Sequence, residues 1–131
     1  MVASGGELSR LMLGLKTIFT GLQGISCVIF DEIDTGVSGA VASSIGLKMV
    51  LLSKSAQVFS VTHLAQVAAC ADHHVFVSKS LVDERTMISI RHLNTNERIE
   101  QLAMISSGSI SEASLIAAEE LFDTNQKIAK N

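Results

Sequence analysis

The sequence has few charged residues and few aromatic residues. Asp, Glu, Lys and Arg make up 18% of the 131 residues, against about 25% in an average domain, whereas apolar residues reach 47% and aromatic residues only 4%. A chain of this length can bury a core of its own. An apolar surplus with so few aromatic residues nevertheless predicts one half of a larger α/β domain, whose cut face carries residues meant for the other half.

A strong basic charge is also missing. The formal net charge is −3 and the Lys and Arg residues are scattered, whereas a free-standing nucleic-acid-binding protein would carry them clustered on one face. The sequence has neither the long uncharged apolar run of a membrane span nor the succession of residues typical of a signal peptide. Cys27 and Cys70 lack CxxC spacing, which favours a reduced intracellular setting over a disulfide scaffold. We therefore expect a cytoplasmic protein without membrane contact.

Helical and strand patterns alternate along the chain, which predicts an α/β fold with a mostly parallel sheet flanked by helices. A first helix is expected over 7–22, with one apolar stripe facing a core: Leu8, Leu11, Met12, Leu15, Phe19 and Leu22. The next helix, capped by Ser38 and reaching about Ser53, is expected to turn four residues inward: Val41, Ile45, Met49 and Leu52. The remaining elements are expected at 27–30 (a strand covered on both faces), 58–61 (strand), 64–72 (short helix), 75–77 with 86–93 (hairpin), and 96–105 and 111–122 (helices, followed by a frayed end).

Polar side chains follow two consecutive strands of this predicted sheet. Asp31 and Glu32 end the first strand, and Thr62 and His63 end the second. Ligands of open parallel sheets bind beyond the carboxyl ends of the strands, and phosphate-binding ATPases hold Mg²⁺ with an Asp at such a strand end. Glu32 points away from Asp31 because strand side chains alternate, which suits it to act as a general base on a water molecule. The alternatives are that Asp31 and Glu32 merely end a strand in solvent and that His63 is an ordinary hydrogen-bonding residue.

The stretch ASGGELSR begins the first helical pattern. Ser4 and Glu7 have the spacing of a capping box, which stabilises a helix start by about 1 kcal/mol. The cap does not explain Gly5 and Gly6, because each glycine in a first turn costs roughly 0.5–1 kcal/mol relative to alanine. Glycines there leave the backbone amides bare, so that a phosphate can approach the positive end of the helix. From the residues alone, both the cap and the phosphate contact remain open.

Three segments, ASGGELSR, CVIFDEIDTGVSG and VTHLAQVA, occur in an order that resembles the carboxyl-terminal half of the nucleotide-binding head of ABC-type ATPases. They match its signature motif, its Walker B strand with the D-loop, and its switch histidine. More narrowly, DEIDTGVSG, THLAQVAA, ADHH and NERIEQLAMISSG look like the RecN family of DNA repair proteins, which is related to the SMC family. The resemblance runs from Val2 to Phe122. It implies a partial P-loop NTPase fold of the ABC-head type in which the Walker A strand is absent.

The resemblance implies an ATPase of DNA double-strand break repair and recombination, with ATP and Mg²⁺ as cofactors. Two heads would sandwich two ATP molecules in a homodimer. It implies that Ser4, Gly5, Gly6 and Glu7 contact the ATP of the partner subunit, and that Asp31 orients Mg²⁺ through its water shell. Glu32 would polarise the attacking water and His63 would hydrogen-bond the γ-phosphate. The D-loop residues would line the dimer seam: Asp34, Thr35, Gly36 and Ser38.

Two features of such heads are missing. No G-x-x-x-x-G-K-[ST] motif occurs, so the loop that cradles the β- and γ-phosphates is not in this chain, and no long heptad pattern indicates coiled-coil arms. We therefore expect a fragment, inactive alone, that needs the amino-terminal half of the same head. By resemblance, the Walker A strand of that half would lie beside the strand ending at His63. DNA would be contacted through the intact, nucleoid-associated protein.

Two other functions remain open. The chain could be a truncated, non-catalytic module that associates with another ATPase half through its signature face or an exposed sheet edge, or a product without activity. It also departs from the family at Ser38, where many SMC-type heads carry Asp, at Met104, where Arg is expected, and at Ser106, where a larger apolar residue is expected. A metal cluster of Cys70, His73 and His74 is disfavoured because a fourth ligand is lacking and adjacent residues of a strand point to opposite sides.

Overall fold

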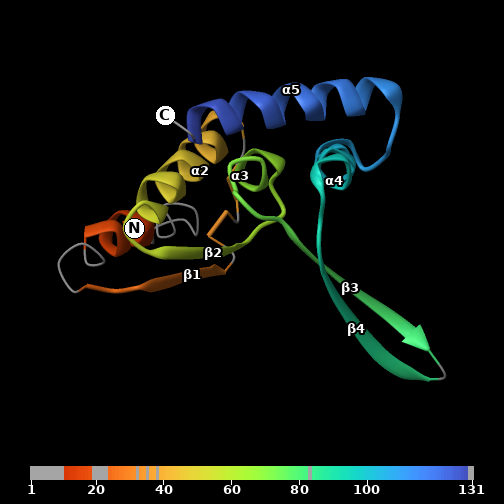
Figure 1. The fold of residues 1–131 in the computed structure, drawn as a ribbon, viewed down its shortest axis with the longest axis horizontal. Coiled ribbons are helices and arrows are strands. Elements are labelled where there is room, and N and C mark those ends of the chain that lie inside the picture. The colour runs from red at the N-terminus through yellow and green to blue at the C-terminus, as the bar shows by residue number, and fades with distance from the viewer. Residues whose placement is uncertain are drawn as a thin grey trace.

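The computed structural model describes residues 11–18, 24–31, 33–34, 36–37, 39–82 and 84–129. Residues 11–18 are helical. The elements that follow are β1 (Cys27–Asp31), α2 (Gly39–Ser53), β2 (Gln57–Val61), α3 (Ala65–Ala68), β3 (Val75–Val82), β4 (Arg85–His92), α4 (Thr95–Ser107) and α5 (Glu112–Ala129). Figure 1 shows the helices above the β1–β2 pair and the β3–β4 hairpin extending away from them.

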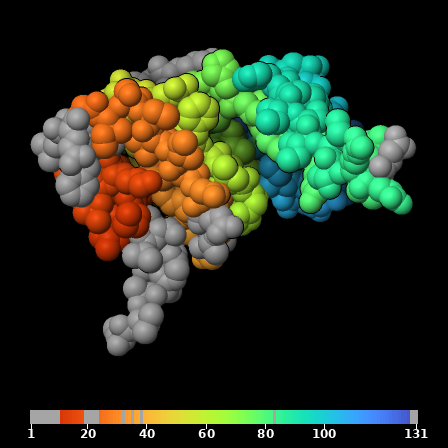
Figure 2. All heavy atoms as spheres, turned by 90° about the horizontal axis from the view of Figure 1, so that it is seen from below, coloured from red at the N-terminus to blue at the C-terminus, as the bar shows by residue number. Residues whose placement is uncertain are grey.

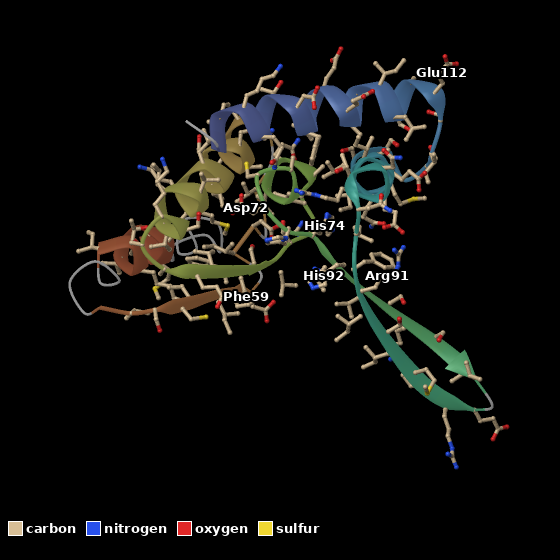
Figure 3. The ribbon with its side chains drawn as sticks, viewed as in Figure 1. Phe59, Asp72, His74, Arg91, His92 and Glu112 are labelled. Carbon is tan, nitrogen blue, oxygen red and sulfur yellow. The ribbon has the colours of Figure 1, made fainter. Side chains whose placement is uncertain are left out.

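β1 and β2 are parallel, as the βαβ pattern predicts, with Ile29 opposite Phe59 and Asp31 opposite Val61. Val28 and Phe30 are buried on the face that α2 covers. The expectation that β1 is covered on both faces is wrong, because the other face exposes Ile29 (62%), Phe59 (49%) and Val61 (62%). A continuous apolar run does not reveal that one of its two faces lacks a cover. Figure 3 shows Phe59 on this face, pointing away from the helices.

The first hydrophobic cluster joins β1, α2 and the helical residues 11–18. α2 agrees with its predicted bounds, and Ile45, Met49 and Leu52 are buried as expected, but Val41 is exposed. In the described part of the first helix, Leu13 is the buried residue, whereas Leu11, Met12 and Leu15 of the predicted core stripe are exposed. The helix contacts the sheet through the Leu13 side, where Lys16 lies 5.1 Å from the ring centroid of Phe30.

A second cluster joins α3, α4 and α5 through small residues. Its buried members are Ala65, Ala68, Ala69, Leu102, Ala103 and Ala118. The buried guanidinium of Arg98 fastens α4 to the segment after α3, because it donates to the main-chain oxygens of Ala71 and Asp72 (3.1 Å to Asp72) and lies 4.7 Å from the ring of Phe122. Small side chains allow the three helices to approach closely, and Arg98 satisfies carbonyls that the loop leaves unpaired.

The predicted hairpin is confirmed, but β3 extends to Val82 instead of ending at Val77. Its strands pair from Val75–His92 to Val82–Arg85, and paired residues of antiparallel strands share a face. One face is therefore largely apolar and exposed: Val75, Val77, Leu81, Ile88 and Ile90, with Lys79, Thr86 and His92 among them. In Figure 2 the hairpin, in green, lies at the opposite end of the molecule from the red residues of the first helix.

The last two helices form where the sequence predicts them. α4 begins with a capping box of Asn94 and Glu97 and ends at Gly108, whose φ of 74° lies in the left-handed region. Met104 and Ser106, the two departures from the family pattern, are both exposed on this intact helix. The expected fraying after Phe122 is wrong for residues 123–129, because α5 continues to Ala129, and residues 130–131 lie outside the described residues. None of the helices in the described residues has the length and apolar composition needed to cross a membrane.

Candidate functional site

The structure describes part of the predicted site. Asp31, Asp34, Gly36 and His63 lie within the described residues. The predicted contacts to the partner's ATP, the predicted general base and two residues of the D-loop lie outside them: Ser4, Gly5, Gly6, Glu7, Glu32, Thr35 and Ser38. The geometry of the site is therefore given by the carboxyl ends of β1 and β2 and by the turn after β1.

The two strand ends meet at one edge of the sheet. Asp31 is the last residue of β1 and is paired in register with Val61, the last residue of β2. His63 follows two residues later, and both Asp31 and His63 are exposed. The expectation that the two strand tips adjoin is confirmed, because parallel strands in register end at the same edge. Their roles toward a nucleotide remain a proposal.

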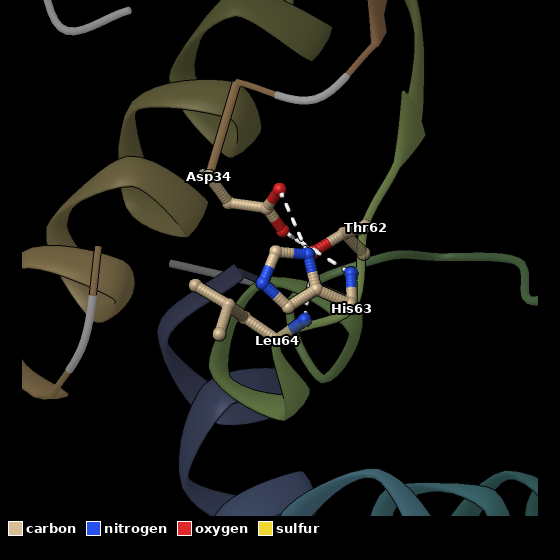
Figure 4. Close-up of polar contacts among 4 residues, drawn as sticks. All are labelled: Asp34, Thr62, His63 and Leu64. Carbon is tan, nitrogen blue, oxygen red and sulfur yellow. Dashed lines mark hydrogen bonds and ion pairs between the residues drawn. The ribbon is translucent and has the colours of Figure 1, made fainter. Parts of the chain in front are cut away.

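Asp34 holds the end of β2 to the turn after β1. Its side chain is fully buried (0% exposed), and its Oδ2 accepts hydrogen bonds from the Thr62 hydroxyl and from the main-chain N–H of His63 (3.2 Å). The Thr62 hydroxyl in turn accepts from the N–H of Leu64 (3.1 Å). Figure 4 shows this chain of donors and acceptors. Because the hydroxyl has a single proton, its donation to Asp34 fixes its orientation.

The turn that presents Asp34 inward is anchored on both sides. Ile33 and Val37 are buried in the first cluster, and the N–H of Val37 donates to the Asp34 carbonyl (3.1 Å). Gly36 has a φ of 70°, a left-handed conformation that side chains rarely adopt. Two apolar anchors and one glycine therefore direct the carboxylate toward β2.

The inward direction of Asp34 differs from the sequence-based expectation. The resemblance places Asp34 at a dimer seam, but its side chain lies inside this chain and contacts Thr62 and His63. Gly36, by contrast, is exposed. Sequence reasoning also gave no role to Thr62. The available signal was the spacing of Asp34 between the apolar residues Ile33 and Val37, which indicates a pinned turn.

His63 presents its ring to both Asp34 and solvent. Its Nδ1 lies 3.4 Å from Asp34 Oδ1, and 67% of its side chain is exposed. Oδ1 itself is buried and has no hydrogen-bond partner among the described residues. The distance is that of an ion pair, but the bond geometry is not met, so one oxygen of a buried carboxylate faces the imidazole without a completed hydrogen bond.

Asp31 is the residue of the described site that could hold a metal ion. Mg²⁺ is usually bound through one or two carboxylates together with phosphates and waters, so a single exposed carboxylate such as Asp31 can serve it. Within the described residues, no three His, Cys, Asp or Glu side chains gather closely enough to form a metal site of their own. Asp31 alone could therefore supply one ligand, and the remaining ligands of the metal would come from phosphates and water.

Cys70, His73 and His74 lie between α3 and β3, not on a strand, so the expectation that the adjacent histidines point to opposite sides of a strand is wrong. Cys70 is buried, and the single proton of its thiol has two acceptors within reach, Asn125 Oδ1 (3.2 Å) and the Gln66 carbonyl (3.3 Å). Burial raises the pKa of this thiol, so it stays protonated and packs as a small apolar side chain.

Several curated proteins have sequences similar to this chain. A RecN DNA repair protein from Halalkalibacterium halodurans is 47% identical over 131 aligned residues, which cover 99% of this chain and 23% of that protein. The RecN protein of Bacillus subtilis is 47% identical over 107 residues (82% of this chain, 19% of that protein), and that of Deinococcus radiodurans 48% over 120 residues (92% and 21%). The chain thus spans about a fifth of the length of these curated relatives.

The fold has a solved counterpart as well. A structure described as "Structural biochemistry of ATP-driven dimerization and DNA stimulated activation of SMC ATPases" superposes with a TM-score of 0.56 at 20% identity, covering 82% of this chain and 65% of that one. No family model matches the sequence. By sequence the chain is therefore related to the RecN DNA repair proteins, corresponding to their carboxyl-terminal part, and its α/β fold is shared with the solved SMC ATPase structure.

Proposed function

We propose that this chain is the distal half of the ATP-binding and ATP-hydrolysing head of a RecN-type protein, acting in the cytoplasm at the nucleoid in repair and recombination of broken DNA. The observation that carries this proposal is the shared edge of β1 and β2, where Asp31 and His63 end neighbouring parallel strands. This edge is where open α/β sheets bind their ligands. The similarity to RecN proteins supports the same assignment.

In this proposal, the residues of the chain have separate roles around one nucleotide. Mg²⁺ and ATP, when bound, supply the charge neutralisation and the transferable phosphate. Asp31 orients the metal through its water shell, Glu32 accepts a proton from the attacking water, and His63 donates to the γ-phosphate. Ser4, Gly5, Gly6 and Glu7 contact the nucleotide of a second head, so that two heads close around two ATP molecules.

The exposed apolar faces support the proposal that this chain packs against another half of the head. The open face of the β1–β2 pair carries Ile29, Phe59 and Val61, and one face of the hairpin carries five more apolar side chains. Within the described residues, β2 pairs only with β1, which leaves its other edge unpaired. An unpaired edge and uncovered apolar faces need partners. We assign them to the amino-terminal half of the same head, which by resemblance supplies the Walker A strand.

The ATPase activity of this chain, measured alone and after addition of the amino-terminal half, tests the proposal. Alone, the chain is expected neither to bind ATP tightly nor to hydrolyse it. In the intact protein, Glu32→Gln is expected to lower turnover on the order of 10²- to 10⁴-fold while heads still dimerise with ATP. Glu119→Gln, an exposed position on α5, is the matched control. Robust hydrolysis by the isolated chain, or unchanged turnover in Glu32→Gln, would count against the proposal.

The same apolar faces also favour a second candidate, a non-catalytic module that docks on another ATPase half. Light scattering of the chain with and without the amino-terminal half separates the two. A head fragment forms a complex with that half and gains ATPase activity, whereas a module forms a complex without gaining activity. A stable monomer that does not bind the amino-terminal half would contradict both candidates.

A further inference from the structure

The contact between Asp34 and His63 points to a role that the similarity does not assign. Asp34 is fully buried, yet the described residues give hydrogen bonds to only one of its two carboxylate oxygens. The other, Oδ1, faces Nδ1 of His63 at 3.4 Å. A buried, unpaired carboxylate oxygen is costly, and among the described residues the group near enough to pair with it is the imidazole.

The donors on Oδ2 hold the imidazole in place. Thr62 lies directly before His63, and the main-chain N–H of His63 donates to the same oxygen, so Asp34 holds the main chain just before the His63 Cα. Just after it, the N–H of Leu64 donates to the Thr62 hydroxyl. The ring therefore starts from a main chain that is already fixed to the carboxylate, and a small rotation of the side chain is enough to align an Nδ1–H with Oδ1. In Figure 4 a dashed line joins Asp34 to one ring nitrogen, and the second ring nitrogen lies farther from the carboxylate.

We infer that Asp34 is a positioning residue for His63: its buried carboxylate keeps a proton on Nδ1 and thereby turns Nε2 toward an incoming terminal phosphate. A carboxylate accepts hydrogen bonds and does not donate them, so only the Nδ1–H form of the ring satisfies Oδ1. The identity of the phosphate rests on the proposed function. The tautomer itself follows from the contact between the two side chains.

This tautomer has a chemical consequence for phosphate binding. With the single proton of the neutral ring on Nδ1, Nε2 has only a lone pair, and a phosphate oxygen also has only lone pairs to offer. A hydrogen bond between them requires a second proton on Nε2, so the phosphate meets a positively charged imidazolium. Charge-assisted hydrogen bonds are about twice as strong as neutral ones. Asp34 is the only carboxylate among the described residues close enough to pair with this ring.

Long-range ¹H–¹⁵N NMR of this chain, without nucleotide, tests the inference at a pH above the ordinary titration range of histidine. The ¹⁵N shifts of a histidine ring show which nitrogen carries the proton, and a His63→Gln variant identifies the His63 signal among the four histidines. The wild-type chain is expected to show Nδ1–H. Asp34→Asn, whose amide can donate to Nδ1, is expected to move the proton to Nε2. Asp123→Asn on exposed α5 is the matched control and is expected to leave the tautomer unchanged.

The possible outcomes decide the inference separately from the proposed function. An Nε2–H tautomer in the wild-type chain overturns the inference, even if the Asp34→Asn variant fails to fold. The inference is also overturned if the wild-type chain and Asp34→Asn show the same tautomer. In the intact protein, Asp34→Asn is expected to lower kcat on the order of ten- to a hundredfold by removing the charge on the imidazole. A tautomer that switches while ATP turnover does not change supports the pairing of Asp34 with His63 and contradicts the γ-phosphate role of His63.

Discussion

Gly46 of α2 lies against Cys70, just after α3, so closely that a Cβ on Gly46 would stand 2.6 Å from the Cys70 thiol sulfur and 3.2 Å from the Gln66 carbonyl oxygen. No side chain fits between the two segments at this point. The glycine is thus explained by the close approach of the helices and not by backbone conformation.

Gly46→Ala is therefore expected to destabilise the chain by about 1–3 kcal/mol, as overpacking does, although alanine has the higher helix propensity. Urea unfolding followed by circular dichroism measures the change. Gly14→Ala is the control, because Gly14 is helical and a Cβ there meets no atom within 4 Å. Cys70→Ala should recover part of the loss in the double variant, since it removes the sulfur. Equal effects at Gly14 and Gly46 would show that the contact is not tight.

Arg98 offers a second test of the packing between α3 and α4. It is buried, donates to the carbonyls of Ala71 and Asp72, and stacks on Phe122. Arg98→Met leaves the Asp72 carbonyl without this donor, and we expect a loss of about 2 kcal/mol in the free energy of unfolding.

Arg98→Lys is expected to fall between wild type and Arg98→Met, because one ammonium group cannot reach both carbonyls and also stack on a ring. Arg91→Met is the comparison at the surface, where Arg91 pairs with Glu97 and is half exposed; a much smaller effect is expected there. Thermal unfolding of the three variants gives the order. If Arg98→Met is as stable as wild type, the buried guanidinium contributes no net stability.

The shared edge of the sheet was predictable because two apolar runs end at polar side chains and βαβ units make neighbouring strands parallel. The direction of Asp34 was missed: its spacing between Ile33 and Val37 can be seen in the sequence, but the cluster that buries these two residues is formed by distant segments. The exposed face of β1 was missed for a similar reason. The residues Cys27–Phe30 look alike on both faces, and only the fold shows that α2 covers one of them.

The length of α5 shows another feature that the sequence alone does not predict. Its last turns contain Asn125 and Gln126, polar residues that indicate a frayed end when only composition is considered. In the structure Asn125 is buried and accepts a hydrogen bond from the Cys70 thiol, and Gln126 donates to the Ala69 and Ala71 carbonyls (3.1 Å each). These polar side chains form hydrogen bonds with carbonyls and a thiol near α3. α5 therefore continues because of contacts with residues that are far away in the sequence.

The capping box of α4 predicts that loss of the Asn94 side chain destabilises the protein. Asn94 Oδ1 accepts from the N–H of Glu97 (3.0 Å), and Glu97 Oε2 accepts from the N–H of Asn94 (2.9 Å). Asn94→Ala is expected to cost about 1 kcal/mol at neutral pH, whereas Asn94→Asp should retain most of the cap. Chemical unfolding of the three proteins measures the difference, and an unaffected Asn94→Ala variant would show that α4 does not need its cap.

The main-chain N–H of Asn94, and then the Arg91 side chain, hold the pKa of Glu97 below its usual value. A carboxyl group with a depressed pKa in the folded state stabilises the protein above its unfolded pKa, and this contribution is lost as the pH falls through the folded pKa. Glu97→Gln is therefore expected to be less stable than wild type at neutral pH. The difference should shrink on acidification, and a constant difference would show that ionisation of Glu97 does not contribute.

His74 predicts loss of stability on mild acidification. It lies between α3 and β3, half-buried, beside the hairpin base (Figure 3), and its buried Nδ1 has no hydrogen-bond partner among the described residues. Burial, and then the positive charge of Arg98, lower the pKa of this imidazole below its ordinary value. The folded state therefore binds a proton at His74 less readily than the unfolded state does.

Because the unfolded state takes up the proton first, the free energy of unfolding should fall as the pH drops below the unfolded pKa of histidine, about 6.5. The fall should end below the folded pKa, where both states are protonated. His74→Gln, which does not titrate, is expected to flatten this part of the stability profile, whereas His73→Gln at the exposed neighbour should not. Unfolding measured at several pH values gives the profiles of all three proteins. Parallel profiles for wild type and His74→Gln would mean that the imidazole is protonated equally in both states and that neither burial nor Arg98 disfavours its charge.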